Sequence, residues 1–301
     1  MCDRTKSTKD VIFMVKRFFI IGIFFLLSSI IAEAHPGIGI VMNSEGTVFY
    51  TDLTHVWRIS PSGERSIAVR NVHTHELYLD DQDNLYGEHE WYKGEATDKW
   101  GNYVWCLTKA GEFKKVVPEV EGFLENNTLV RDPEGNSYWT ENPNGQQVIN
   151  RQSPDGKNTP VTTHKFGNIR WMHYSQADNY LYVVDELELK KVSPTGEVSV
   201  IAANLKEATP PFENVADRHY VFGMWTNEKN DIYVAVYGAC KVKRIDADAT
   251  VTTVYQSKKG WSPCGGLITQ NGTQWIMEFS ENNKTRVIRI DRNGDETIYG
   301  D

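Results

Sequence analysis

The chain has 301 residues, of which 40% are hydrophobic and 24% charged, and its formal net charge at pH 7 is −8. These values are typical of a soluble globular protein and argue against a disordered chain. The acidic balance also argues against a general electrostatic affinity for nucleic acid or for an anionic membrane surface.

The N-terminal segment predicts export. An apolar run over residues 18–31 follows the basic pair Lys16-Arg17 and ends in Ala32-Glu33-Ala34. The run is too short for a comfortable membrane span, and the small-residue ending is typical of a secretory signal peptide. We therefore predict a signal peptide over residues 1–34, with Met14 as an alternative start, and a mature domain over 35–301. The predicted location is secreted or periplasmic without a stable membrane anchor; an uncleaved N-terminal anchor is the alternative.

A sixfold repeat dominates the mature chain. A turn followed by an aromatic strand recurs at intervals of about 40–50 residues, which is the period of a propeller blade. The equivalent aromatic positions are Phe49, Tyr86, Tyr138, Tyr182, Tyr233 and Trp275.

A second strand follows each aromatic strand and closes in a tight turn, most often one that contains Gly. These segments are 56–64, 104–112, 148–156, 189–197, 242–247 and 287–295, and outer strands such as 65–69 and 296–299 complete the units. Four-stranded units at this period predict an all-β protein, a six-bladed β-propeller of four-stranded blades. A β-sandwich is the alternative, but it does not explain six copies of one order of turns and strands.

Closure of the predicted ring is a separate question, because the first and last units each contain all four of their strands. Unless the mature N-terminus pairs with the last blade, the ring closes through side-chain packing, with or without a covalent tie. Cys240 and Cys264 are expected on one face of adjacent blades, where a disulfide is geometrically feasible. Two partly buried thiols are the alternative.

The first unit, HPGIGIVMNSEGTVFYTD, resembles the NHL-repeat and gluconolactonase/regucalcin-like propellers, and the stretch around His75 is similar to streptogramin lyases. The resemblance implies a fold that hosts lactonases, lyases and pure binding modules. Gluconolactonase-like members hold a divalent cation over the channel with Glu, Asn and Asp side chains. Asn127 and Glu125 are the positions that match this oxygen set, so histidine chemistry is a better expectation than a calcium lactonase.

Histidines are predicted to gather on one face of the propeller, the face of the loops that join second to third strands and one blade to the next. The histidines in these segments are His35, His55, His73, His75, His89, His164 and His219. Histidine is the commonest metal ligand and the main acid–base group near neutral pH. The predicted metal ligands are His35, His73, His75 and Asn127, with calcium, zinc and copper all open, and the alternative is a polar channel lining.

The candidate catalytic residues are His75 and His89, as metal ligand or general base, with Glu141 and Asp185 as supporting oxygen donors. The aromatic residues expected to bind substrate by stacking are Trp91, Tyr92, Trp100 and Trp171. The first three belong to a long predicted loop after the aromatic strand of the second unit. A structural alternative is that these aromatics cover the edge of the blade.

Taken together, the sequence predicts an exported, monomeric propeller that acts as a metal-assisted hydrolase or lyase at the mouth of the channel. The expected ligand is a small polar cyclic molecule, a lactone or a sugar-derived compound, whose carbonyl a bound cation would polarise. The alternative is a non-catalytic module that binds a glycan or a protein. The motifs G-x-S-x-G and H-E-x-x-H do not occur, which argues against a serine hydrolase and a zincin.

Overall fold

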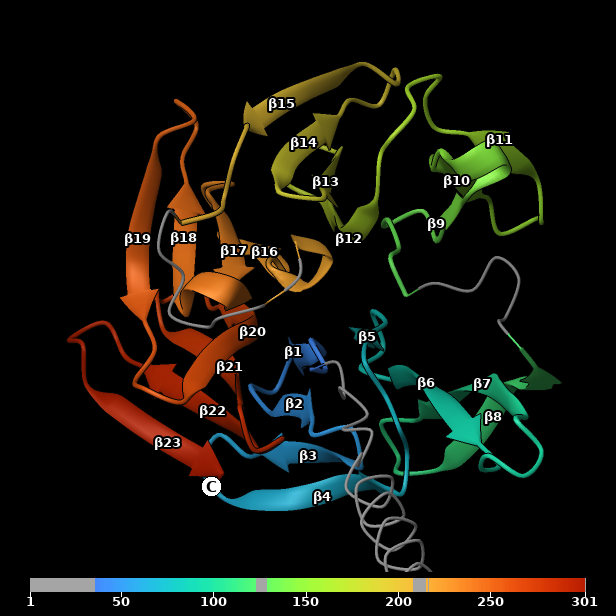
Figure 1. Cartoon of the computed structure of the whole chain (residues 1–301). Coiled ribbons are helices and arrows are strands. Elements are labelled where there is room, and N and C mark those ends of the chain that lie inside the picture. The colour runs from blue at the N-terminus through green and yellow to red at the C-terminus, as the bar shows by residue number, and fades with distance from the viewer. Residues whose placement is uncertain (1–35, 123–128, 208–214, 216, 301) are drawn as a thin grey trace, which may run out of the picture. The chain divides into compact units, whose positions relative to one another are not determined.

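The computed structural model describes residues 36–122, 129–207, 215 and 217–300. Within this part of the chain six antiparallel sheets, the blades, follow one another in a ring (Figure 1). Five blades have four strands in sequence order, and the third has three named strands. The predicted six-bladed β-propeller is therefore confirmed. The predicted signal peptide and two predicted metal ligands, His35 and Asn127, lie outside the described residues.

The blades take up their strands in chain order. The first two blades contain β1 (Ile40–Met42), β2 (Val48–Thr51), β3 (His55–Ile59), β4 (Arg65–Arg70), β5 (Leu77–Leu79), β6 (Leu85–Tyr92), β7 (Trp100–Leu107) and β8 (Phe113–Glu121). The next two contain β9 (Ser137–Glu141), β10 (Val148–Gln152), β11 (Asn158–Pro160), β12 (Ile169–Ser175), β13 (Tyr180–Asp185), β14 (Glu188–Val192) and β15 (Val198–Ala202). The last two contain β16 (Met224–Thr226), β17 (Ile232–Val236), β18 (Lys241–Ile245), β19 (Val251–Gln256), β20 (Trp261–Ile268), β21 (Gln274–Ser280), β22 (Thr285–Ile290) and β23 (Glu296–Gly300).

The third blade departs from the predicted four strands at its inner edge. The inner strand is reduced there to an isolated pairing of Arg131 with Ser137, and the amide of Tyr138 donates to the carbonyl of Val130 at 3.2 Å. Short 3₁₀ turns η1 (Pro143–Gly145), η2 (Asp217–His219) and η3 (Tyr237–Ala239) interrupt the loops. The described chain contains no helix with the length and hydropathy needed to cross a bilayer.

In three blades the recurring aromatic residue is a tyrosine whose hydroxyl donates to an aspartate of the turn that precedes its strand. In the second blade the Asp80 carboxylate accepts the amides of Gln82 and Asn84, at 3.0 and 2.8 Å, and also the hydroxyl of Tyr86 at 3.1 Å. A side chain that accepts amides two and four residues later builds a tight turn. The same hydroxyl-to-carboxylate bond joins Tyr138 to Asp132 and Tyr182 to Asp178.

The hydrophobic core is divided among the interfaces between blades. Separate clusters of buried side chains join the first blade to the second, the third to the fourth, the fourth to the fifth and the fifth to the sixth. A further cluster closes the ring, with Ile40 and Tyr50 of the first blade packed against Met277 and Val287 of the sixth. The first and last blades exchange no strand. The ring therefore closes by side-chain packing, and Cys106, Cys240 and Cys264 are buried free thiols.

Candidate metal and catalytic site

Three potential metal ligands converge in the second blade. One donor atom each from His73, His75 and Glu90 lies within 4.8 Å of the other two. The two imidazole rings meet edge to face with their centroids 4.8 Å apart. We call these three residues the blade-two cluster. Of the predicted metal ligands, the structure therefore brings together His73 and His75, and it adds Glu90, which is not among the ligands predicted from the sequence.

The backbone of residues 73–76 is held by side chains of β6. The amides of His75 and Glu76 both donate to Glu88 Oε1, the second at 3.1 Å. The amide of His73 donates to His89 Nδ1 at 2.9 Å, and the carbonyl of His73 accepts the amide of Glu90 at 3.0 Å. Each of these bonds fixes the segment that carries the two imidazoles. The cluster is thus anchored to a strand of the sheet, which favours a defined geometry.

The electrostatic environment differs between the two imidazoles. Burial, followed by the neighbouring charge of His75, lowers the pKa of His73, so this ring stays neutral and able to bind a cation. Burial opposes the charge on His75 as well, but hydrogen bonding and attraction from Glu88, with the charge of Glu90, raise its pKa. His75 Nδ1 lies 3.6 Å from Glu88 Oε1 and 3.9 Å from Glu90 Oε2. A divalent cation bound by His75 would therefore displace the imidazole proton that Glu88 and Glu90 stabilise.

The chemistry of these donors fits some metal ions better than others. Neutral imidazole with one carboxylate suits zinc, copper, iron and nickel, whereas calcium takes oxygen ligands throughout. The side chains of His75 and Glu90 are 24% and 43% exposed, so the cluster is open to solvent on one side. Three protein ligands with an open position are the pattern of catalytic rather than structural zinc sites.

His89 uses its Nδ1 to accept the backbone of His73, and its ring packs against Tyr103 with a centroid distance of 4.7 Å. Burial, together with the charges of His73 and Lys115, lowers the pKa of His89. The Nδ1 atom of this predicted catalytic residue is therefore already used as an acceptor, and its ring holds the backbone segment that carries His73 and His75.

The two predicted carboxylates, Glu141 and Asp185, lie in the third and fourth blades. Asp185 accepts the amides of Gly167 and Asn168 at 3.0 and 2.8 Å and the Lys190 ammonium at 2.5 Å. Although burial opposes ionisation, these bonds lower the pKa of Asp185. Glu141 is exposed and accepts the indole N–H of Trp139 at 3.4 Å. Among the described residues, no hydrogen bond or ion pair joins either carboxylate to the blade-two cluster.

The aromatic residues predicted to bind substrate fall into two places. Trp91, Tyr92 and Trp100 belong to an extended hairpin, because β6 continues to Tyr92 and β7 begins at Trp100, where sequence reasoning expected a loop. Tyr92 is 56% exposed, whereas Trp91 packs against Gly101 and is covered by the Lys93 ammonium at 4.5 Å. Trp171 lines the central channel. The structure does not bring these four aromatics together.

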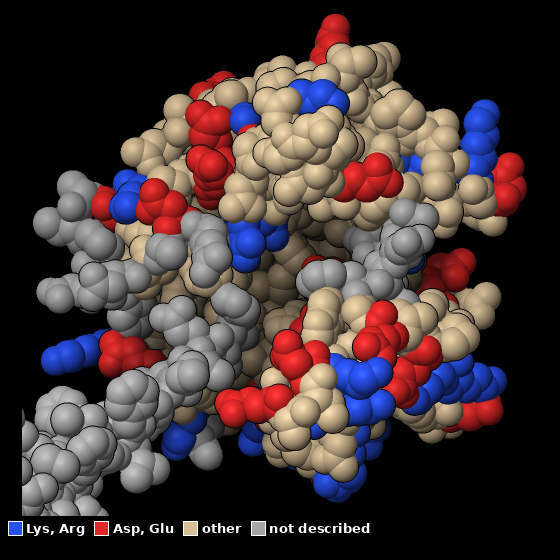
Figure 2. Space-filling model, turned by 45° about the vertical axis from the view of Figure 1, so that its right-hand side comes forward, with Lys and Arg blue, Asp and Glu red and all other residues tan. Residues whose placement is uncertain are grey.

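Acidic and basic side chains lie intermixed over the surface in the view of Figure 2. On and beside the outer strand β8 they form ion pairs, Lys114 with Glu112, Lys115 with Glu119 and Lys99 with Glu121. Exposed pairs of this kind contribute little stability. They also protect the outer edge of the blade against pairing with another chain.

Fold and cluster together define a six-bladed β-propeller with a candidate metal site. No protein-family model matches the sequence, and no curated protein matches it. Solved structures do. A virginiamycin B lyase from Staphylococcus aureus gives a TM-score of 0.51 at 17% identity, over 88% of this chain and 84% of the lyase.

Two other solved structures are similar over most of their length. A gluconolactonase from Xanthomonas campestris gives a TM-score of 0.55 at 14% identity, over 85% of this chain and 83% of that one. The calcium-binding protein regucalcin from Agrobacterium tumefaciens gives 0.51 at 15% identity, over 80% and 81%. At these identities the likeness establishes a shared fold. The resemblance to these propellers that the sequence repeats indicated is therefore confirmed at the level of the fold.

Proposed function

We propose that the protein is a metal-assisted hydrolase or lyase acting on a small polar cyclic substrate, a lactone or a sugar-derived compound. The observation that carries this proposal is the convergence of His73, His75 and Glu90 within 4.8 Å. The shared fold with a virginiamycin B lyase and a gluconolactonase supports it. Fold alone does not assign activity, so the assignment depends on the cluster.

The roles of the residues follow from their surroundings. His73, His75 and Glu90 would bind a divalent ion of the zinc type, and such an ion polarises a substrate carbonyl and stabilises developing negative charge. Glu88 and His89 hold the backbone of the ligands in place. Partners that orient metal ligands are commonly worth about 10–100-fold in affinity or activity. The exposed side of Glu90 leaves room for a substrate to approach.

Metal titration of the purified chain tests the site. Isothermal calorimetry with zinc should show one equivalent bound to the native protein, and the affinity should fall at least tenfold in His75→Ala and in Glu90→Gln. His55→Ala is the matched control, because His55 lies on the same face but beside Asp52, with 4.0 Å between His55 Nδ1 and Asp52 Oδ1. Native protein that binds no zinc, or variants that bind as tightly, would contradict the proposal.

Activity requires a second measurement. A panel of lactones monitored with a pH indicator reports hydrolysis, because ring opening releases a proton. We expect turnover by the zinc-loaded native protein and its loss in His75→Ala with the fold intact by circular dichroism. Stoichiometric zinc binding without turnover of any lactone or sugar-derived substrate would favour the non-catalytic alternative.

We also propose that the protein is exported to a secreted or periplasmic location and works as a monomer on a small ligand, without nucleic acid. The support is the basic pair and apolar run before Ala32-Glu33-Ala34. N-terminal sequencing of the exported protein should begin at His35. A chain that stays uncleaved in the membrane fraction would contradict this part of the proposal.

A further inference from the structure

A cavity lies on the axis of the ring, and its lining includes none of the three residues of the blade-two cluster. The cavity has a volume of about 1030 Å³ and is surrounded by β1, β5, β12, β16 and β20 together with residues 129–131. It extends from Ile38 and Glu76 to the turns at 43–46 and 269–271. These turns join first to second strands, so the cavity leads toward the face opposite the loops that carry His73 and His75.

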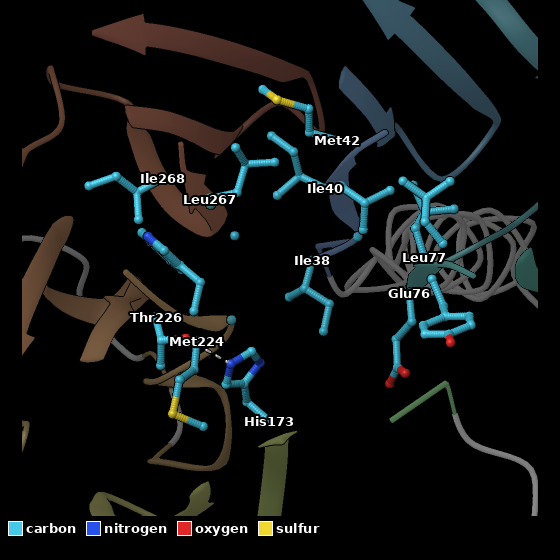
Figure 3. Close-up of a pocket in the computed structure, with 18 of the residues that line it drawn as sticks. Ile38, Ile40, Met42, Glu76, Leu77, His173, Met224, Thr226, Leu267 and Ile268 are labelled. Atoms are coloured by element: carbon cyan, nitrogen blue, oxygen red, sulfur yellow. Dashed lines mark hydrogen bonds between the residues drawn. The ribbon is translucent and has the colours of Figure 1, made fainter. Parts of the chain in front are cut away.

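Apolar side chains form much of the wall. In Figure 3 the side chains of Ile38, Ile40, Leu77, Met224, Leu267 and Ile268 surround the open space, and Glu76 and His173 project into it from different blades. The inner strands are edge strands of their sheets, so their backbone also faces the channel. The cavity therefore offers an apolar surface with scattered hydrogen-bonding groups, which is the usual character of a small-molecule site.

The ionisable side chains His173, Glu76 and Arg131 in the wall leave one charge at neutral pH, that of Arg131. His173 is bonded to Thr226 Oγ1 at 3.3 Å, and burial lowers the pKa of His173 to about 4, so the ring is neutral. Glu76 and Arg131 also line the cavity. Burial, followed by the charge of Glu88, raises the pKa of Glu76 to about 8, so this carboxyl is largely uncharged at pH 7. Arg131 would therefore repel a cationic ligand.

We propose that this channel binds a predominantly apolar small molecule without positive charge, which enters from the face of the first-to-second strand turns. The volume suits a drug-sized ligand, because such sites commonly measure about 300–1,000 Å³. A glycan is a poor occupant, since its hydroxyls would meet Ile40, Met224 and Leu267 instead of hydrogen-bond partners. A folded protein domain is too large for a cavity of about 1030 Å³. The proposal does not depend on metal binding by the blade-two cluster.

Nile red, an uncharged apolar dye with a carbonyl acceptor, is the probe for the test. Its fluorescence should rise saturably with one dye bound for each chain. Leu267→Lys, which places a charge in the wall, should weaken binding at least tenfold, and Leu267→Trp, which fills the space without adding charge, should do the same. Ile298→Lys is the matched control, because Ile298 is 43% exposed on the outer strand β23; its affinity should stay within twofold of the native value.

Two further comparisons separate this site from others. His75→Ala should bind the dye as the native protein does, because the cluster is not part of the cavity. The cationic dye rhodamine 6G should bind at least tenfold more weakly than Nile red, because Arg131 lines the cavity. The proposal is overturned if the native chain shows no saturable binding, if natively folded Leu267→Lys and Leu267→Trp both keep full affinity, or if the cationic dye binds as tightly as Nile red.

Discussion

Glu88 is the residue on which the geometry of the blade-two cluster depends most directly. A single carboxylate oxygen accepts two consecutive backbone amides, those of His75 and Glu76. Hydrogen bonds to an ionised acceptor are stronger than neutral ones. Glu88 therefore fixes the backbone at residues 75 and 76, which lead into β5, and with it the position of the His75 side chain.

Removal of the Glu88 carboxylate should consequently weaken metal binding without removing a ligand. We expect Glu88→Ala to lower zinc affinity by about 10–100-fold, the usual effect of losing a partner that orients a ligand. Calorimetric titration measures the change. Glu141→Ala provides the control, because Glu141 is exposed and lies in another blade; equal losses in the two variants would refute the positioning role of Glu88.

A second carboxylate, Glu278, is fully buried between the fifth and sixth blades. It accepts the Tyr255 hydroxyl at 2.9 Å and Arg286 Nε at 2.7 Å. The Arg286 guanidinium also lies 4.0 Å from the ring centre of Trp261. Glu278 is thus paired with Arg286 inside the protein. Removal of the Glu278 carboxylate would leave the buried Arg286 guanidinium without a compensating negative charge.

Glu278→Ala should lower the free energy of unfolding by about 3–5 kcal/mol, because breaking one side of a buried ion pair strands the other charge. The double variant Glu278→Met with Arg286→Met should recover most of that loss, since apolar residues of similar volume remove both charges together. Urea denaturation measures both effects. A double variant less stable than Glu278→Ala would show that the pair contributes more than charge compensation.

The buried His173 should make the free energy of unfolding depend on pH. Its folded pKa of about 4 lies below the ordinary value of 6.5, so the unfolded chain binds a proton more readily between these two values. Stability is therefore lost as pH falls from 6.5 to 4, by up to about 3 kcal/mol. His173→Gln should show a correspondingly smaller loss over that range in urea denaturation. Parallel pH profiles of the two proteins would refute this assignment.

Among the structural elements, the hairpin of β6 and β7 is longer than the hairpin of second and third strands in any other blade. Its two strands pair over eight residues and carry Trp91, Tyr92 and Trp100 to the tip. The connecting residues 95–99 are exposed, so they bury little apolar surface. The base of the same hairpin holds Glu88 and Glu90, which means that tip and cluster can be tested separately.

Replacement of residues 94–98 by Asn-Gly gives a two-residue turn that suits paired strands. We expect a change in melting temperature of less than about 2 °C, because exposed positions contribute little to stability. Zinc affinity should also stay unchanged. A loss of zinc binding in this variant would show that the tip contributes to the cluster; calorimetry and thermal unfolding by circular dichroism measure the two quantities.

The elements also show how far the sequence could predict the structure. Outer strands expected over 65–69 and 296–299 are observed as β4 and β23, because alternation and tight turns are local properties. The length of the β6–β7 hairpin was not predictable, since its tip residues carry no pattern that separates a hairpin from a loop. Glu90 was missed as a ligand for a related reason: strand alternation places Glu88 and Glu90 on one side, but only the packed sheet decides which neighbour that side meets.

At the scale of the whole molecule, glycines set how closely the inner strands approach the axis. A Cβ atom at Gly265 would collide with the carbonyl of Ile38, and one at Gly39 would lie 2.8 Å from the amide nitrogen of Leu77. A glycine at these two inner-strand positions is therefore a requirement of ring packing. Gly265 and Ile38 face each other where the last blade meets the first.

Gly265→Ala should accordingly destabilise the ring by about 1–3 kcal/mol, the usual cost of overpacking. Gly167→Ala is the control, because the nearest atom to a Cβ there is the flexible carboxylate of Glu186 at 3.3 Å. Thermal unfolding measures the difference. If both variants lose the same stability, close approach at the junction of the two blades is not the cause.

The junction of the first and last blades lacks any shared strand or covalent link, and this has a mechanical consequence. Cys240 and Cys264 remain thiols, and the contact between the two blades rests on the cluster around Ile40 and Met277. Tension applied between residues 36 and 300 acts directly on that apolar contact, whereas every other blade boundary is spanned by a covalent loop. Under such tension the first and last blades should separate from each other before the strands of any blade lose their pairing.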